Sequence, residues 1–138
     1  MDFFASFANL FIGFFCILRG LAALCRPQGE FAIIGIQDRR ASDDDASSSP
    51  IFMLGVRDVS IGFFIIIHQF LDNPIAVATI LLLLACFKLG DSVVVFADGD
   101  ENKRTKAAGH LVACLVLLAW TVYIAMHFIQ SGSAGRGY

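Results

Sequence analysis

Charged residues are scarce in this chain of 138 residues, because Asp, Glu, Lys and Arg together make up only 16% of it. An ordinary globular domain is about 25% charged and about 45–50% apolar. This chain is 57% hydrophobic, and its 10 Lys and Arg are balanced by 12 Asp and Glu. The balance leaves no basic excess for binding nucleic acid, and the hydrophobic excess excludes a disordered chain and a soluble enzyme.

Features of secreted and metal-binding proteins are also missing. The 4 cysteines include no C-x-x-C pair, so neither a disulfide framework nor a zinc site is implied. The chain begins Met-Asp-Phe-Phe, without the basic start and small-residue cleavage site of a secretory signal peptide. We therefore expect the first apolar block to remain in the mature protein.

The hydrophobic residues are gathered in four blocks, at residues 3–24, 51–71, 75–96 and 108–129. At 1.5 Å per residue each block reaches roughly 32 Å, enough to cross a hydrocarbon core of about 30 Å. The blocks lack the alternation of apolar and polar residues that a barrel strand requires. The sequence therefore predicts an all-α fold, a single integral membrane domain built as a four-helix transmembrane bundle with antiparallel neighbours.

Lysines and arginines between the blocks indicate the orientation in the membrane. Six lie in the first and third connections, which fall on the same side of a four-span chain, and one follows the fourth block. The positive-inside rule places both connections in the cytosol and both termini on the non-cytosolic side. The six are Arg26, Arg39, Arg40, Lys103, Arg104 and Lys106, and the seventh is Arg136.

The connections differ in character. Residues 31–36 are apolar but too short to span, so we expect an interfacial or re-entrant segment. If this segment has a function, we expect it to cover the bundle as a capping flap. Residues 37–50 are rich in Asp and Ser and predict a mobile cytosolic loop. The Asp-Asn-Pro sequence at 72–74 predicts a tight turn, because Pro is favoured at the start of a helix. Residues 97–107 predict a short charged loop.

Several ionisable side chains lie inside the predicted spans, although a charge at the centre of a transmembrane helix costs about 2.5–3.5 kcal/mol on insertion scales. With the orientation above, six of them fall in the cytosolic half of the bundle. Two carboxylates, three cations and one imidazole at a similar depth predict a polar chamber to which every helix contributes. The six are Arg19, Arg57, Asp58, Lys88, Asp91 and His110.

Helical spacing indicates which of these groups can meet. Lys88 and Asp91 are three residues apart and share a face, whereas the adjacent Arg57 and Asp58 diverge by about 100°. One of that pair is expected to point inward while the other reaches a neighbouring helix. The first span also carries a stripe of small or polar residues that suits close packing against another helix. The stripe consists of Ser6, Asn9, Gly13, Cys16 and Gly20.

Structural roles are open for the same residues. Arg19 and Lys88 lie near enough to an interface for their charged ends to snorkel out of the bilayer. His110 can flank or cap a helix start. Arg57 and Asp91 can form an ion pair that fixes helix register.

Three short motifs lie on the second, third and fourth spans: GVRDVSIG at 55–62, LGDS at 89–92 and GH at 109–110. Together they resemble the pattern of a family of small four-span membrane proteins of unknown function, with members in bacteria and filamentous fungi. The resemblance covers residues 5–128, and Arg26-Pro27 fits the basic-proline step after the first helix of that family. The acidic, serine-rich residues 38–49 depart from the pattern as an insertion.

Some fungal members of this kind accompany polyketide or terpenoid pathways, and the resemblance implies a membrane-embedded enzyme that opens an epoxide of a lipophilic intermediate. Epoxide opening needs an acid at the ring oxygen and a base that activates water or an internal hydroxyl, and two carboxyl groups in unlike environments can divide these roles. A soluble class of epoxide hydrolases has a similar Asp, Arg, Asp set. The candidate catalytic residues are Asp58, Asp91, Arg57 and His110, and the candidate substrate-binding residues are Arg19, Lys88 and Asn9.

The same carboxyl groups suit other functions. A hydroxyl nucleophile would make the enzyme a cyclase, and protonation of an alkene would make it a sterol or isoprenoid isomerase. A non-enzymatic protein that binds lipid or organises partner enzymes would keep Arg57 and Asp58 as a structural network. The scheme requires no metal, cofactor or nucleic acid. The expected partners are a lipophilic substrate and membrane lipid, and Gly13 with Gly20 would permit a homodimer. The expected location is the endoplasmic reticulum of a fungus or, equally, a bacterial inner membrane.

Overall fold

The computed structural model describes residues 3–34, 49–99 and 101–134, which form five helices. In chain order these are α1 (Phe3–Cys25), α2 (Pro27–Ile34), α3 (Ser49–Phe70), α4 (Pro74–Asp98) and α5 (Lys103–Ala134). All but α2 are long and apolar enough to cross a membrane. The described part of the chain is therefore helical, as predicted, and its four long helices indicate a multi-pass integral membrane protein.

Large apolar side chains cover the outward faces of these helices. On α1, for example, Phe7, Phe11 and Phe14 are all exposed. A soluble protein rarely exposes so much contiguous apolar surface, whereas a membrane protein satisfies its backbone within helices and presents such side chains to hydrocarbon. The exposed phenylalanines therefore supply contact with lipid.

The helix boundaries match the expected turn and extend several of the expected spans, α5 most of all. The turn at residues 72–74 is confirmed, because α4 begins at Pro74 and the side chain of Asn73 accepts a hydrogen bond from the backbone N–H of Ala76 at 3.1 Å. α5 begins at Lys103, so the last residues of the loop expected at 97–107 are helical instead. Lysine and arginine are good helix formers, and these residues continue the helix beyond its apolar part. The loop expected at 37–50 lies outside the described residues, except that residues 49 and 50 begin α3.

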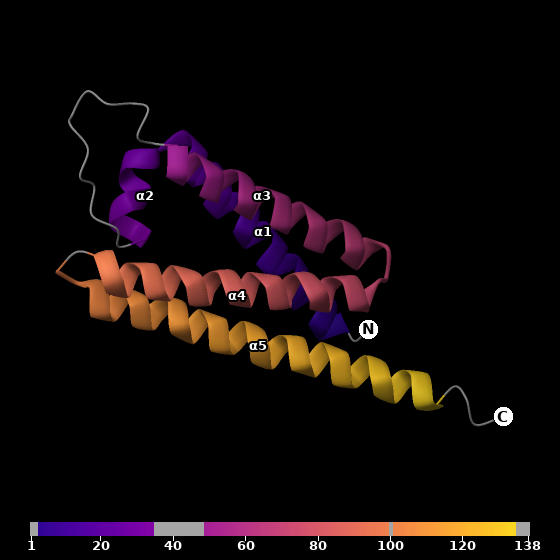
Figure 1. The fold of residues 1–138 in the computed structure, drawn as a ribbon. Helices are drawn as coiled ribbons and strands as arrows, with labels where there is room; N and C mark the ends of the chain where they lie inside the picture. Colours follow the sequence, from indigo (N-terminus) through magenta and orange to yellow (C-terminus); the bar gives the residue numbers. More distant parts are fainter. Residues whose placement is uncertain (1–2, 35–48, 100, 135–138) are drawn as a thin grey trace.

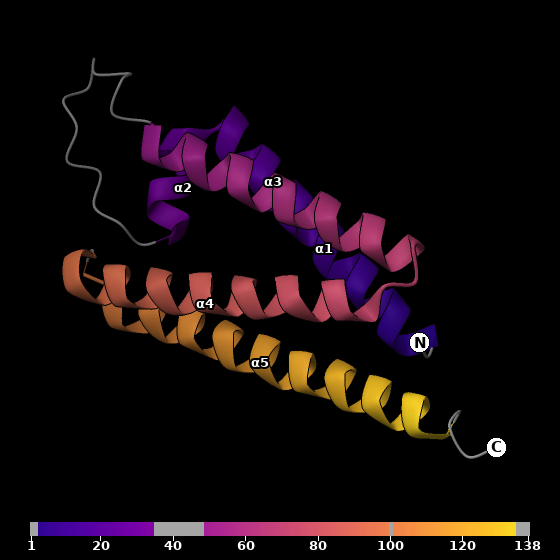
Figure 2. The same cartoon turned by 45° about the vertical axis from the view of Figure 1, so that its right-hand side comes forward.

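The long helices form two close pairs, α1 with α3 and α4 with α5 (Figure 1). In both views α3 and α4 lie nearest at the turn that joins them and diverge toward their other ends (Figure 2). α2 lies across this wider end, which we call the α2 end of the bundle. The opposite end, called the turn end, holds the α3–α4 turn, the start of α1 and the end of α5.

α1 and α3 meet at two pairs of glycines, which we call the glycine seam. A Cβ atom added to Gly20 would lie 2.5 Å from the carbonyl oxygen of Gly55, and one added to Gly62 would lie 2.5 Å from the carbonyl oxygen of Gly13. The two backbones therefore approach closely only because these positions lack a side chain. The pairing also shows that α1 and α3 run in opposite directions. The close-packing face predicted on the first span is confirmed, and α3 is its partner.

An apolar cluster packs α2 against the rest of the bundle. Phe31 and Ile34 of α2 are buried against Ile51 of α3 and Val95 of α4. These contacts remove the apolar face of α2 from solvent and hold it at the α2 end. Residues 31–34, part of the expected flap, thus belong to a helix that packs on the bundle.

We expect the substitution Gly20→Ala to destabilise the protein by about 1–3 kcal/mol, because the added Cβ overlaps the α3 backbone. Gly90→Ala is the matched control, since a Cβ atom there meets nothing within 4 Å and alanine favours a helix by about 1 kcal/mol over glycine. Thermal unfolding of the purified proteins in detergent measures both effects. Equal stability of the two variants would contradict the close packing of α1 against α3 at the glycine seam.

Candidate functional site

The structure brings together the six ionisable residues expected in the cytosolic half. All of them line one small space of about 20 Å³ at the α2 end, to which α1, α3, α4 and α5 each contribute and which α2 also lines. We call this group, with Glu30 of α2, the polar cluster. Its members are Arg19, Glu30, Arg57, Asp58, Lys88, Asp91 and His110.

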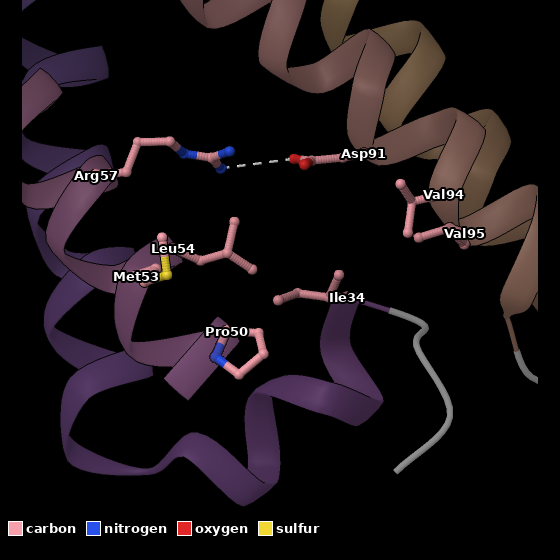
Figure 3. Close-up of a pocket in the computed structure, with 8 residues that line it drawn as sticks. All are labelled: Ile34, Pro50, Met53, Leu54, Arg57, Asp91, Val94 and Val95. Atoms are coloured by element: carbon pink, nitrogen blue, oxygen red, sulfur yellow. Dashed lines mark ion pairs between the residues drawn. The ribbon is translucent and has the colours of Figure 1, made fainter. Parts of the chain in front are cut away.

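Arg57 lies between the two carboxylates of the cluster. Its Nε donates a hydrogen bond to Asp58 Oδ1 at 3.0 Å, and its Nη2 lies 3.7 Å from Asp91 Oδ2 on the facing helix (Figure 3). The guanidinium also lies over the ring of Phe87, with Cζ 4.7 Å from the ring centroid. The three side chains form an Asp–Arg–Asp set that joins α3 to α4.

The contact between Arg57 and Asp58 adds to what helical spacing predicts. One residue of this pair was expected to reach a neighbouring helix, and Arg57 does so at Asp91 of α4, but it also contacts Asp58. The separation of about 100° applies to the Cα–Cβ directions, and the long arginine side chain spans it while its Nη2 still faces α4. The expectation for Lys88 and Asp91 is confirmed, because Lys88 Nζ donates to Asp91 Oδ2 at 3.2 Å.

Glu30 is a cluster member that sequence reasoning missed. It is only 3% exposed, and its Oε2 accepts a hydrogen bond from Arg19 Nη2 at 3.0 Å. Arg19 therefore contacts a carboxylate of α2, a partner not considered in the snorkelling alternative. The available signal was that Glu30 is the single charged residue of the segment PQGEFAII. A lone carboxylate in a short apolar segment beside a membrane needs a partner.

His110 contacts the other end of α2. Its Nε2 lies 3.3 Å from the backbone carbonyl oxygen of Ile34, the last residue of that helix. A carbonyl can only accept, so this hydrogen bond requires the proton on Nε2. Carbonyl groups in the last turn of a helix lack partners within the helix. His110 therefore caps the end of α2, a different helix from its own.

Asn9 lies apart from the polar cluster. It precedes Arg19 by ten residues, which is about 15 Å along α1. Asn9 is fully buried, its Nδ2 donates to Gln69 Oε1 at 2.9 Å, and its Oδ1 accepts from Trp120 Nε1 at 2.9 Å. Gln69 Nε2 in turn donates to Ser6 Oγ at 3.1 Å. These bonds form an amide network that joins α1, α3 and α5 nearer the turn end.

A larger cavity of about 450 Å³ opens beside the Asp–Arg–Asp set. Arg57 and Asp91 face each other at one end of it, and the rest of its lining is apolar (Figure 3). The volume lies in the range of about 300–1,000 Å³ that is typical of small-molecule sites. Among the described residues, no group of three or more His, Cys, Asp or Glu side chains is placed to hold a metal ion. The apolar lining residues are Ile34, Pro50, Met53, Leu54, Val94 and Val95.

We expect Glu30→Gln to loosen α2, because Arg19 then loses its charged acceptor while the apolar seat of α2 remains. The exchange rate of α2 amide hydrogens should rise by about tenfold or more, since a hydrogen bond to a charged group contributes about 1.5–3 kcal/mol. Glu101→Gln is the matched control, because Glu101 is exposed before the start of α5. Hydrogen exchange read by mass spectrometry measures both variants. Unchanged α2 exchange in Glu30→Gln would show that the ion pair does not hold the helix.

Comparison with curated proteins and with solved structures gives no match. A family model does match, over residues 13–124, and its description is "Domain of unknown function (DUF4267)". The matched range contains the glycine seam, α2 and every member of the polar cluster, and it covers most of the chain. The chain therefore belongs to the DUF4267 family of proteins of unknown function.

Proposed function

We propose that this protein is a membrane-embedded enzyme that opens an epoxide of a lipophilic substrate, as a hydrolase or a cyclase. The observation that carries the proposal is the position of Arg57, 3.0 Å from Asp58 and 3.7 Å from Asp91, at the polar end of an apolar cavity. Two carboxyl groups on one guanidinium can supply the acid and the base that epoxide opening needs.

In the proposed reaction one carboxylate removes a proton from water, and the water oxygen attacks an epoxide carbon. The bond between that carbon and the ring oxygen breaks, and the ring oxygen takes a proton from the other carboxyl group. The product is a vicinal diol. Proton transfer between the two carboxyl groups, or with solvent, restores the starting state. If a hydroxyl group of the substrate replaces water, the product is a cyclic ether of unchanged mass.

Arg57 fixes the two groups relative to each other and offsets negative charge on either of them. Its contact with Asp91 is too long for a hydrogen bond, so both groups keep hydrogen-bonding capacity toward the cavity. An oxygen atom of the substrate that approaches from the cavity can lie within hydrogen-bonding distance of both groups. Lys88 acts through Asp91 and is a positioning residue, while Arg19 and His110 hold α2 beside the site through Glu30 and Ile34.

The orientation in the membrane is part of the same proposal. Arg26 and the lysines of the first turn of α5 lie at the α2 end, which the positive-inside rule places in the cytosol. The polar cluster then lies in the cytosolic half of the bundle, and both termini are non-cytosolic. In a fungus the host membrane would be the endoplasmic reticulum.

The contacts also favour a second candidate, a non-enzymatic protein in which the ion pairs fix helix packing. Glu30, Asp58 and Asp91 each have a cation at 3.0–3.2 Å, the arrangement that a buried structural charge requires. In this case neutralising a carboxylate lowers the stability of the protein, and there is no turnover to lose.

We expect Asp58→Asn and Asp91→Asn each to lower turnover by about 10²–10⁴-fold, because each removes a group that transfers a proton. Membranes containing each protein are incubated with a panel of lipophilic epoxides in oxygen-18 water, and the products are read by mass spectrometry. A labelled diol formed by the wild type indicates hydrolysis, and an unlabelled product of unchanged mass indicates cyclisation.

Asp72→Asn is the matched control for this experiment. Asp72 lies in the turn at the opposite end of the bundle, with φ 48°, a conformation that asparagine also tolerates. Its turnover should equal that of the wild type. Full activity in Asp58→Asn or Asp91→Asn would overturn the acid and base assignment. Loss of thermal stability in both variants, with no turnover by the wild type, would favour the structural candidate.

A further inference from the structure

We infer that the 450 Å³ cavity holds the apolar body of the substrate, and that the substrate enters it sideways from the bilayer between α3 and α4. The oxygen-bearing end of the molecule leads and reaches Arg57 and Asp91. The identity of the reacting group rests on the proposed function. The cavity, its opening and its apolar occupant are inferred independently, from the lining residues and their exposure.

The cavity follows one face of each of two helices. On α3 its lining residues are Pro50, Met53, Leu54 and Arg57, spaced three and four apart. The same spacing recurs on α4, from Asp91 to Val95. Residues with this spacing share a helix face, and seven residues of α3 rise by about 10 Å. The cavity therefore extends about two helical turns from its polar end toward the α2 end.

One side of the cavity is closed and the other is open. Leu54 is partly buried, and Val95 and Ile34 are buried, so they form the inner wall and the base. Met53 is 74% exposed and Val94 is 51% exposed, one on α3 and the other on α4. In a helix that spans a membrane, exposed apolar side chains contact lipid. The rim between Met53 and Val94 therefore opens to hydrocarbon, at the place where Figures 1 and 2 show α3 and α4 diverging.

The lining indicates the chemistry of the occupant. A hydrated molecule would lose hydrogen bonds along an apolar wall, whereas a lipophilic molecule would not. At the polar end Arg57 already contacts two carboxylates, and Asp91 contacts a second cation, Lys88. The charges there are compensated, so the site suits a neutral oxygen group in place of an anionic head. The substrate class is a lipophile with a neutral epoxide or hydroxyl oxygen near one end and an apolar segment of about 10 Å behind it.

Photolabelling of the wild type tests the occupant directly. The probe is a long-chain terminal alkyl epoxide that carries a diazirine on its chain, and the protein is held in phosphatidylcholine nanodiscs. We expect crosslinks within residues 50–57 and 91–95, mapped by peptide mass spectrometry and suppressed by an excess of the same epoxide without the diazirine. Crosslinks spread evenly over the lipid-facing phenylalanines of α1, with no suppression, would overturn the inference.

Narrowing the rim provides a second test. Val94→Trp should lower both the specific crosslinks and kcat/KM by about tenfold or more, since the bulky ring fills space that the substrate needs. Val93→Trp is the matched control, because Val93 is 62% exposed on the same helix and does not line the cavity. Equal labelling and turnover in the two variants would overturn the inference. If Val94→Trp does not fold, the crosslink map of the wild type alone tests whether the cavity holds the substrate.

The route of entry has its own measurement. The epoxide is loaded into the phosphatidylcholine vesicles that hold the protein, and an excess of an aqueous epoxide scavenger that does not enter the bilayer is added at the start of the reaction. Entry from the bilayer predicts that the initial turnover is unchanged by the scavenger. Suppression of the initial turnover would overturn lateral entry.

The two proposals fail in different ways. Specific crosslinks in the cavity that Val94→Trp removes, with no turnover of any epoxide, would establish the cavity and refute epoxide opening. Epoxide opening would be established, and the cavity would be refuted as the substrate site, if turnover depended on Asp91 but not on Val94 and the crosslinks lay elsewhere.

Discussion

The close approach of α1 and α3 at the glycine seam sets the depth of every polar group that the two helices carry. With Gly13 opposite Gly62 and Gly20 opposite Gly55, Arg19 is level with residue 56, next to Arg57. The same register sets Ser6 level with Gln69, and these two side chains are hydrogen bonded. Lipid supplies no hydrophobic force between helices, so small-residue contacts and interhelical hydrogen bonds must supply the attraction. The seam does both, because it brings the backbones together and aligns the polar side chains.

The two ends of the bundle use their polar groups differently. Nearer the turn end, neutral amides and an indole N–H join three helices, because Asn9 of α1 is hydrogen bonded to Gln69 of α3 and to Trp120 of α5. At the α2 end, one ion pair joins α1 to α2 and another joins α3 to α4, where these two helices lie farther apart. The amide network holds the pairs together where they converge, and charged side chains with longer reach connect them where they diverge. The cavity occupies the space that this divergence leaves.

Local periodicity predicted the features that depend on one helix at a time. The four spans, the turn at Pro74, the packing stripe of α1 and the Lys88–Asp91 pair all follow from spacing along the chain. Glu30 was missed because its partner depends on how α2 folds back over Arg19, which no single-helix pattern contains. The Arg57–Asp58 contact was missed because spacing gives the direction of Cβ and not the path of a long side chain. The cavity could not be predicted from local spacing either, since it exists only because α3 and α4 separate toward one end.

The composition of the polar cluster has a consequence for an energised membrane. Counted by formal charge, its three cations are matched by three carboxylates among the described residues. A membrane potential does work of about 2.3 kcal/mol per 100 mV on each net elementary charge moved across the bilayer. With all six groups ionised, the set has no net formal charge and the transmembrane voltage exerts almost no net force on it, whereas protonation of one carboxyl group, which the proposed acid requires, leaves one net positive charge for the voltage to act on. The set comprises Arg19, Arg57 and Lys88 with Glu30, Asp58 and Asp91.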